Sequence, residues 1–287
     1  MSKPLIIIMG ADGQLGQEFR KISSSYSDYE FKFLTRLDLD LESMDAGREL
    51  LVSLKPQFLI NCAAYTAVDK AETESERAFH INGNVVGEIA AICHQLNTRF
   101  IHYSTDYVFD GNSSNPYKED DGTSPVNIYG ASKLKGEELG LLNNPDSIII
   151  RTSWVYSSFG HNFVKTMIRL LSEKESIRVV NDQVGSPTWA ADLADVTMQI
   201  ISKRKWVPGI YHYSNKGIIS WYDFALAIKE IIHSPCTVHP IPGNDYPTPA
   251  RRPAFSLLDT GKIVSTFSLN VPPWKNSLAA CLKEIQN

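Results

Sequence analysis

The sequence predicts an α/β protein with a doubly wound parallel sheet and a smaller C-terminal domain. Short β-branched runs alternate with helical stretches through the first half of the chain, which is typical of a parallel sheet with crossover helices. Runs such as 58–60 and 148–150 lack polar alternation, as expected for strands covered on both faces. The length of 287 residues exceeds the usual domain of about 100–150 residues, which indicates a second part.

The expected elements follow one another regularly up to residue 154. We expect strands at 5–9, 30–34, 58–61, 99–104 and 147–151. We expect helices between them at 15–23, 44–54, 74–95 and 128–142. Further on, the pattern predicts a helix at 162–172, a strand at 177–180 and a helix at 191–202. The proline-rich segment 235–253 is interpreted as an ordered loop or wall around a site.

Composition and charge limit the classes of partner. The formal net charge of −4 and the pI near 6.0 give no basic field for nucleic acid or an anionic membrane. No stretch approaches the roughly 20 apolar residues needed to cross a bilayer, and the apolar run 5–9 lacks a signal-peptide cleavage pattern. The four cysteines are scattered and are interpreted as reduced thiols. We therefore expect a cytoplasmic protein with no nucleic-acid or membrane partner.

A glycine-rich turn follows the first expected strand. Residues 10–16 have the sequence GADGQLG, in which Gly10, Gly13 and Gly16 are spaced as G-x-x-G-x-x-G. Glycines let the backbone approach a phosphate closely, and the N–H groups at a helix start can bind it. A strand is expected before this turn and a helix after it, so a plain glycine-rich turn is disfavoured. We predict a Rossmann-type pyrophosphate-binding turn whose further cofactor contacts are Asp12, Gln14 and Leu15.

The end of the second strand bears on the choice of nicotinamide cofactor. An acidic residue there binds the free adenosine ribose of NAD, whereas a basic residue accommodates the extra phosphate of NADP. Arg36 follows the strand, and Asp40 and Leu41 lie just beyond, where the adenine is expected. We expect NADP(H) to be preferred, with NAD(H) as an alternative. A solvated surface charge is an equally weighted interpretation of Arg36.

The cofactor turn also sets the expected domain division. Residues 1–155 are predicted to form the NAD(P)-binding Rossmann domain, and residues 156–287 mainly a substrate-binding lid. Segments near 177–203 are expected to return to the first domain.

Tyr129 and Lys133 are four residues apart, which places them on one face of the expected helix 128–142. A nearby ammonium lowers the pKa of a tyrosine from about 10, so Tyr129 could donate a proton to a carbonyl oxygen as hydride arrives. Thr105, at the carboxyl end of strand 99–104, could hydrogen-bond the same carbonyl. Each feature alone has a structural alternative: a surface tyrosine–lysine pair, and a hydroxyl that satisfies backbone at a strand end.

Taken together, these motifs resemble the extended short-chain dehydrogenase/reductase superfamily and, within it, the dTDP-4-dehydrorhamnose reductases. The matching stretches cover nearly the whole chain and are far more specific in combination than alone. They are GADGQLG at 10–16, NCAAYTAVDKAE at 61–72, HYSTDYVFDG at 102–111, PVNIYGASKLKGE at 125–137, RTSWVY at 151–156, NDQVGSPT at 181–188 and YPTPARRPAFS at 246–256.

The resemblance implies roles for individual residues. The catalytic residues would be Tyr129 as proton donor, Lys133 as its partner and Thr105 as the hydroxyl helper. The nicotinamide side of the cofactor would be lined by Ala63, Ala64, Tyr65 and Tyr103. The deoxysugar or its nucleotide would contact Asp106, Trp154 and Arg252, with Arg251 beside the last. Glu137 and Glu138 are interpreted as part of a solvated helix face.

The reaction implied by the resemblance is NAD(P)H-dependent reduction of dTDP-4-dehydro-β-L-rhamnose to dTDP-β-L-rhamnose, a precursor of cell-surface polysaccharides. A nucleotide-sugar 4-epimerase stays open as an alternative, as does a non-catalytic subunit like the regulatory subunit of methionine adenosyltransferase. A 4,6-dehydratase is disfavoured because Thr105 is followed by Asp106 and Tyr107, without a second carboxylate. The resemblance allows a homodimer. No metal is expected, because no carboxylate cluster suggests one.

Overall fold

The computed structural model describes residues 3–203 and 205–286. Its centre is a six-stranded parallel sheet with the strand order β10-β5-β4-β3-β1-β2. The strands are β1 (Leu5–Met9), β2 (Glu30–Leu34), β3 (Phe58–Asn61), β4 (Arg99–Thr105), β5 (Ile148–Thr152) and β10 (Gly209–His212). The predicted fold class is therefore confirmed. The sequence analysis missed β10, which adds a sixth strand beside β5.

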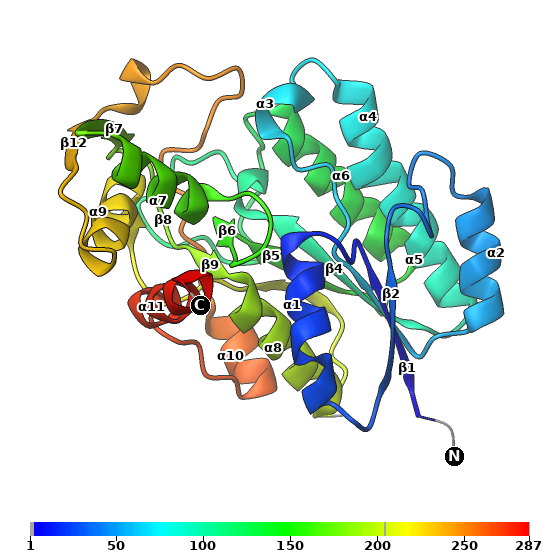
Figure 1. The fold of residues 1–287 in the computed structure, drawn as a ribbon. Helices are drawn as coiled ribbons and strands as arrows, with labels where there is room; N and C mark the ends of the chain where they lie inside the picture. Colours follow the sequence, from blue (N-terminus) through cyan, green and yellow to red (C-terminus); the bar gives the residue numbers. More distant parts are fainter. Residues whose placement is uncertain (1–2, 204, 287) are drawn as a thin grey trace.

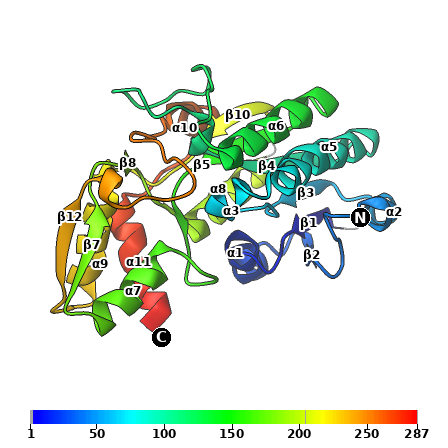
Figure 2. The ribbon, with the colours of Figure 1, turned by 90° about the horizontal axis from the view of Figure 1, so that it is seen from above.

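Helices cover both faces of this sheet (Figures 1 and 2). Alternate residues of β1 point to opposite sides, as strand geometry requires. Ile6 and Ile8 pack with α1 (Gln14–Ile22), α8 (Ala190–Ser202) and α10 (Gly261–Phe267). The opposite face is covered by helices that include α2 (Asp45–Leu54) and α5 (Val85–Gln95). Figure 2 shows α6 (Ile128–Asn143) beside α5 on that face.

The helix expected at 74–95 is continuous but irregular. It consists of α4 (Ser75–Phe79), a π-helical turn (His80–Asn84) and α5, and the short helix α3 (Val68–Ala71) precedes it. Such turns often occur at functional sites. Here the turn carries Asn82, whose side chain accepts from the Tyr65 N–H at 2.8 Å and donates to the Tyr65 carbonyl oxygen at 2.9 Å. The π-helical turn thereby holds the loop that follows β3.

A second part of the molecule has its own hydrophobic core, to the left in Figure 2. It is built from α7 (Phe163–Glu173), β7 (Ser176–Val180), α9 (Trp221–Ile231), β12 (Thr237–Ile241) and α11 (Trp274–Gln286). Two short ladders lie between its helices and the main sheet: β6 (Val155–Tyr156) with β9 (Thr188–Trp189), and β8 (Val184–Gly185) with β11 (Ile219–Ser220).

Two details differ from the expected course of the chain. The segment 235–253 is not loop throughout, because Thr237–Ile241 pairs in parallel with β7 as strand β12. Within the segment 177–203, β7 belongs to this second part, whereas α8 packs in the core of the main sheet. The chain thus crosses between the two parts more than once. The lid role of residues 156–287 stays a prediction. Among the described residues, every helix is too short or too polar to span a membrane.

Candidate active site

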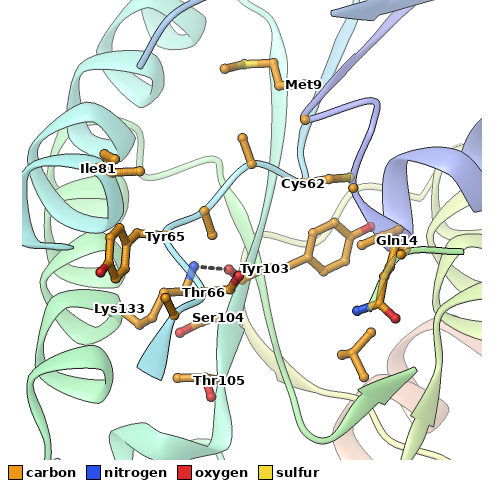
Figure 3. Close-up of a pocket in the computed structure, with 18 of the residues that line it drawn as sticks. Met9, Gln14, Cys62, Tyr65, Thr66, Ile81, Tyr103, Ser104, Thr105 and Lys133 are labelled. Atoms are coloured by element: carbon orange, nitrogen blue, oxygen red, sulfur yellow. Dashed lines mark hydrogen bonds between the residues drawn. The ribbon is translucent and has the colours of Figure 1, made fainter. Parts of the chain in front are cut away.

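A cleft of about 910 Å³ runs along the carboxyl ends of the sheet strands (Figure 3). Open α/β sheets bind ligands at this edge. The cleft brings together most of the residues singled out from the sequence. Those that line it are Gly10, Asp12, Gly13, Gln14, Leu15, Arg36, Asp40, Leu41, Ala63, Ala64, Tyr65, Tyr103, Thr105, Asp106, Tyr129, Lys133 and Trp154. Gly16 and Arg252 do not line it.

The glycine turn is packed tightly between β1 and α1. Gly10 has a φ of +71°, and a Cβ there would lie 2.6 Å from the Ala63 nitrogen. A Cβ on Gly16 would overlap the Gly10 carbonyl oxygen, so Gly16 allows the helix to approach the turn. Gly13 is the N-cap of α1 and has no side chain to cap it. The first N–H groups of α1 thus meet the cleft at the positive end of the helix, which suits a phosphate.

Two arginines stand at the end of the cleft next to β2. The Arg36 side chain is 70% exposed, with its Nε 3.7 Å from the Asp40 carboxylate and its guanidinium 4.0 Å from Glu42. Glu42 is bound more closely by Arg77 of α4, at 2.7 Å. Both Arg77 and Glu42 line the cleft, and sequence reasoning missed both. No local pattern could reveal Arg77, because it reaches this place from another element.

Tyr129 and Lys133 lie on consecutive turns of α6, as their spacing predicts. The Asn127 side chain begins the helix by accepting from the Gly130 N–H at 2.7 Å. Lys133 is only 2% exposed, so the alternative of a surface lysine is wrong. Its Nζ donates to the Tyr103 carbonyl oxygen at 2.6 Å, the dashed contact in Figure 3. Burial lowers the pKa of Lys133 to about 8.

The electrostatics of Tyr129 differ from the expectation. Burial and the Asp106 carboxylate raise the pKa of Tyr129 to about 12, whereas a hydrogen bond with Thr105 lowers it. Lys133 is expected to lower the pKa of Tyr129 but does not do so in this structure, in which its Nζ donates to the Tyr103 carbonyl oxygen. Tyr129 is therefore held as a phenol that carries its proton.

Thr105 and Asp106 form a polar pair where β4 ends. The Thr105 hydroxyl donates to Asp106 Oδ1 at 3.0 Å and accepts from the Tyr107 N–H at 3.2 Å. Asp106 is 2% exposed, and within the described residues its Oδ2 makes no hydrogen bond of normal geometry, although the Ser256 hydroxyl is close enough to lower the pKa of the carboxyl group. Burial raises the pKa of Asp106 to about 7. A buried polar oxygen without a partner at the cleft suits a hydroxyl group of a ligand.

Trp154 is held in an unusual conformation at the cleft wall. Its φ of +48° lies in the left-handed region, which is rare for a bulky residue and common at functional sites. The indole stacks on that of Trp221, with ring centroids 3.6 Å apart and planes 12° apart. Trp221, the first residue of α9, also lines the cleft and was missed from the sequence.

Two charged residues have other partners than expected. Arg252 binds the Asp69 carboxylate with two nitrogens, at 3.0 and 3.1 Å. Glu137 is not on a solvated helix face: it is 2% exposed and binds Arg151 of β5 at 2.7 Å. The face of α6 that carries Tyr129 and Lys133 continues to Glu137 and packs onto the sheet. Glu138, one position further round the helix, is exposed as expected.

A glycine turn between β1 and α1, with a Tyr–Lys pair at the strand ends of a parallel sheet, defines a Rossmann-type protein of the extended short-chain dehydrogenase/reductase superfamily. A family model described as "RmlD substrate binding domain" matches residues 4–287. The chain belongs to this family, which includes the dTDP-4-dehydrorhamnose reductases to which it is similar.

Relatives of known name match nearly end to end. The dTDP-4-dehydrorhamnose reductase of Aggregatibacter actinomycetemcomitans is 41% identical over 95% of this chain and 96% of its own length. The crystal structure of a dTDP-4-dehydrorhamnose reductase from Clostridium acetobutylicum aligns with a TM-score of 0.94 at 37% identity, over 99% of this chain and all of that one. The enzyme of this name from Bacillus anthracis, solved in complex with NADP, has a TM-score of 0.94 at 35% identity, with the same coverage.

Proposed function

We propose that this chain reduces dTDP-4-dehydro-β-L-rhamnose to dTDP-β-L-rhamnose, with NADPH preferred and NADH as a second cofactor. The observation that carries the proposal is the meeting of Thr105, Tyr129 and Lys133 in one cleft with the glycine turn. Membership of the family, and relatives of this name along nearly the whole chain, support the same substrate. The relative from Bacillus anthracis in complex with NADP supports the cofactor.

The cleft fits a dinucleotide at its glycine end. Gly10 lets the turn pack closely against Ala63, and Gly13 begins α1 without a side chain, so the free N–H groups of α1 meet the cleft. Ala63, Ala64 and Tyr65 follow β3 along the same wall, which suits the nicotinamide half. NADPH, when bound, supplies the hydride for C4 of the sugar.

We assign the 2′-phosphate of NADPH to Arg36 and Arg77. Both guanidiniums stand at the end of the cleft beyond β2, and Glu42 lies between them. A phosphate can take over the arginine N–H groups that now face Glu42, and charge-assisted bonds of this kind are strong. Without that phosphate, Glu42 stays bound to Arg77 and can still accept from a ribose hydroxyl through its remaining lone pairs, which would explain the use of NADH as well.

The protein's own part in the chemistry is to hold a carbonyl oxygen and protonate it. Tyr129 would donate a hydrogen bond to the oxygen on C4, and Thr105 would do the same by turning its hydroxyl away from Asp106. As negative charge develops on that oxygen, Tyr129 gives it the phenolic proton and becomes a phenolate. The positive charge of Lys133, one helical turn along α6, would then attract the phenolate, in addition to the hydrogen bond of its Nζ to the Tyr103 carbonyl oxygen.

The sugar and its nucleotide would lie towards the second part of the molecule. Asp106 offers an unpaired carboxylate oxygen for a sugar hydroxyl, and Trp154 an indole face. Residues 156–287 would act mainly as the substrate-binding lid. Arg252 stays a proposed contact for the diphosphate, which would compete with Asp69 for its guanidinium.

The test mixes the purified protein with dTDP-4-dehydrorhamnose generated in situ and follows nicotinamide absorbance with NADPH and NADH separately. We expect stoichiometric consumption of cofactor, lost by at least about a hundredfold in Tyr129→Phe. The Phe variant should still bind NADPH, since only a hydroxyl is removed. No consumption by a folded protein that binds NADPH would shift the proposal to a 4-epimerase or a non-catalytic subunit.

Fewer observations support the other two parts of the proposal, a cytoplasmic location and a homodimer. The four cysteines are free thiols, which suits the reducing cytoplasm. A homodimer would appear as twice the chain mass in light scattering of the purified protein, and a monomer as the chain mass of 32.1 kDa.

A further inference from the structure

Behind Lys133 lies a line of buried polar side chains for which the proposed mechanism has no role. His102 of β4 is 1% exposed, and its Nε2 is 3.2 Å from Lys133 Nζ. Its other ring nitrogen, Nδ1, is 3.1 Å from the Nδ2 of Asn61 on the neighbouring strand β3. Asn61 is also 1% exposed. Three elements thus bring Asn61, His102 and Lys133 into one hydrogen-bonded line beneath the cleft.

The direction of these hydrogen bonds follows from Asn61. Its Oδ1 accepts from the Ala63 N–H at 3.1 Å, so its Nδ2, a donor, faces His102. His102 Nδ1 must therefore be the acceptor. Burial and the Lys133 charge hold the pKa of His102 well below its usual range, so the ring is neutral. A neutral imidazole has one acceptor and one donor, and the donor Nε2–H consequently points at Lys133.

This direction favours one protonation state of Lys133. An ammonium has three hydrogen-bond donors and no acceptor, so it cannot accept from His102 Nε2–H. Two donors would then face each other without a hydrogen bond. A neutral amine has a lone pair that accepts Nε2–H, while one of its N–H groups still donates to the Tyr103 carbonyl oxygen. The hydrogen bonds that run from Asn61 through His102 to Lys133 therefore stabilise the neutral amine of Lys133 relative to its ammonium form.

The other groups around Lys133 only partly counter this effect. Glu137 on the same helix raises the pKa of Lys133, but its carboxylate is already bound by Arg151 of β5. Burial raises the pKa of three other groups that line the cleft, which keeps them neutral near pH 8: Cys62, Tyr103 and Tyr129. Asp106, which acts on Tyr129, has a pKa of about 7 and is charged at that pH.

We propose that His102, oriented by Asn61, is a positioning residue that stabilises Lys133 as a neutral amine. The inference rests on the proposed function, in which Tyr129 is left as a phenolate after each reduction. An N–H bond of Lys133 then breaks, a water molecule between the two side chains passes a proton to the Tyr129 oxygen so that its O–H bond forms again, and His102 donates to the new lone pair. Water returns one proton to the amine before the next turnover. By stabilising the neutral amine, His102 thus helps the Lys133 ammonium to give up the proton that replaces the one Tyr129 has donated.

The first variant is His102→Gln, whose amide can turn its oxygen towards Lys133 and accept from an ammonium. We expect the pKa of Lys133 to rise by about one unit or more. NMR titration of the protein labelled on lysine nitrogen measures it without substrate, with Lys133→Met to assign the signal. The pH at which the reduction rate falls on the alkaline side should rise by the same amount, a shift that lost packing alone would not cause.

The second variant is Asn61→Asp, which reverses the tautomer. A carboxylate accepts from Nδ1–H, so Nε2 becomes the acceptor for the Lys133 ammonium, and the pKa of Lys133 should rise here too. Thr98→Val is the matched control, because it removes a buried hydrogen bond to the Pro56 carbonyl just before β4. It should leave the pKa of Lys133 unchanged.

Folded His102→Gln or Asn61→Asp protein in which the pKa of Lys133 stays within about 0.3 units of the unsubstituted chain would overturn the inference. The NMR result separates this inference from the proposed function. A shift of the Lys133 pKa in a protein that reduces no nucleotide sugar would support the role of His102 and refute the reductase.

Discussion

Glu137 and Arg151 form a buried bidentate ion pair on the face of α6 that also carries Tyr129 and Lys133. The Arg151 Nε and terminal nitrogen lie 2.9 and 2.7 Å from the Glu137 carboxylate oxygens, and both side chains are 2% exposed. Removing one partner of such a pair leaves an uncompensated buried charge. The pair fixes helix α6 to strand β5, and so fixes the height of Tyr129 and Lys133 above the sheet.

We predict that Glu137→Gln destabilises the protein by about 3–5 kcal/mol, because Arg151 stays charged and buried. Urea unfolding followed by circular dichroism measures the loss. Glu138→Gln is the matched control: its side chain is 58% exposed and 3.5 Å from Lys135, so the change should be within about 0.5 kcal/mol. Equal small effects of the two substitutions would show that the buried pair contributes little.

Glu137 also shows where prediction from the sequence fails. Tyr129, Lys133 and Glu137 follow a four-residue spacing, and polar residues at that spacing usually indicate a solvated face. The burial of this face cannot be read from the helix sequence, because the residues that contact it come from strands of the sheet: Arg151 binds Glu137, and His102 lies against Lys133. The glycine turn and the Tyr–Lys pair were predictable because strand, turn and helix are adjacent in sequence. Local patterns could not reveal Arg77 or Trp221, because each reaches the cleft from an element far along the chain.

Two strands, β10 and β12, were missed for a different reason: their own sequences are atypical of strands. β10 is only four residues long, includes a polar histidine and lies at the sheet edge, so its sequence lacks a long apolar run. β12 contains Pro240, which argues against a central strand. It is tolerated because β12 has β7 as its partner in a sheet of only two strands.

Arg77→Ala should weaken NADPH binding about tenfold or more and leave NADH binding within about threefold, because only NADPH has the 2′-phosphate. Fluorescence titration with each cofactor measures the two dissociation constants. Arg48→Ala is the control, since Arg48 pairs with Glu88 at 3.4 Å on the surface and does not line the cleft. Similar losses for both cofactors would place Arg77 elsewhere than at the 2′-phosphate.

Asp106→Asn should stabilise the protein in a pH-dependent way. The folded pKa of Asp106, about 7, lies above the roughly 3.9 of an unfolded aspartate, so the folded state binds the extra proton between these values. The stability from this group is complete below about pH 4 and is lost as the pH rises to about 7.

The advantage of Asp106→Asn should therefore be near zero at about pH 4 and reach the order of 3–4 kcal/mol above about pH 7. Urea unfolding across this range measures it. Reduction should become slower in the same variant, as is common where a strained or destabilising group serves function. A difference in stability that is constant with pH would mean that Asp106 has the same pKa in both states.

Trp221→Ala should impair substrate binding more than chemistry. Trp221 stacks on Trp154 and holds that indole against the cleft, although the Trp154 backbone is strained. Without the stack, Trp154 can relax away from the site, so we expect KM for the nucleotide sugar to rise about tenfold while kcat changes by less than about threefold. Loss of the exciton signal of two stacked indoles in circular dichroism would report the same event without substrate.

Trp206→Ala is the control, because Trp206 packs on Phe58 away from the cleft and should change neither the exciton signal nor KM. If Trp221→Ala removes the exciton signal but leaves KM unchanged, the Trp154 indole has no part in binding the sugar.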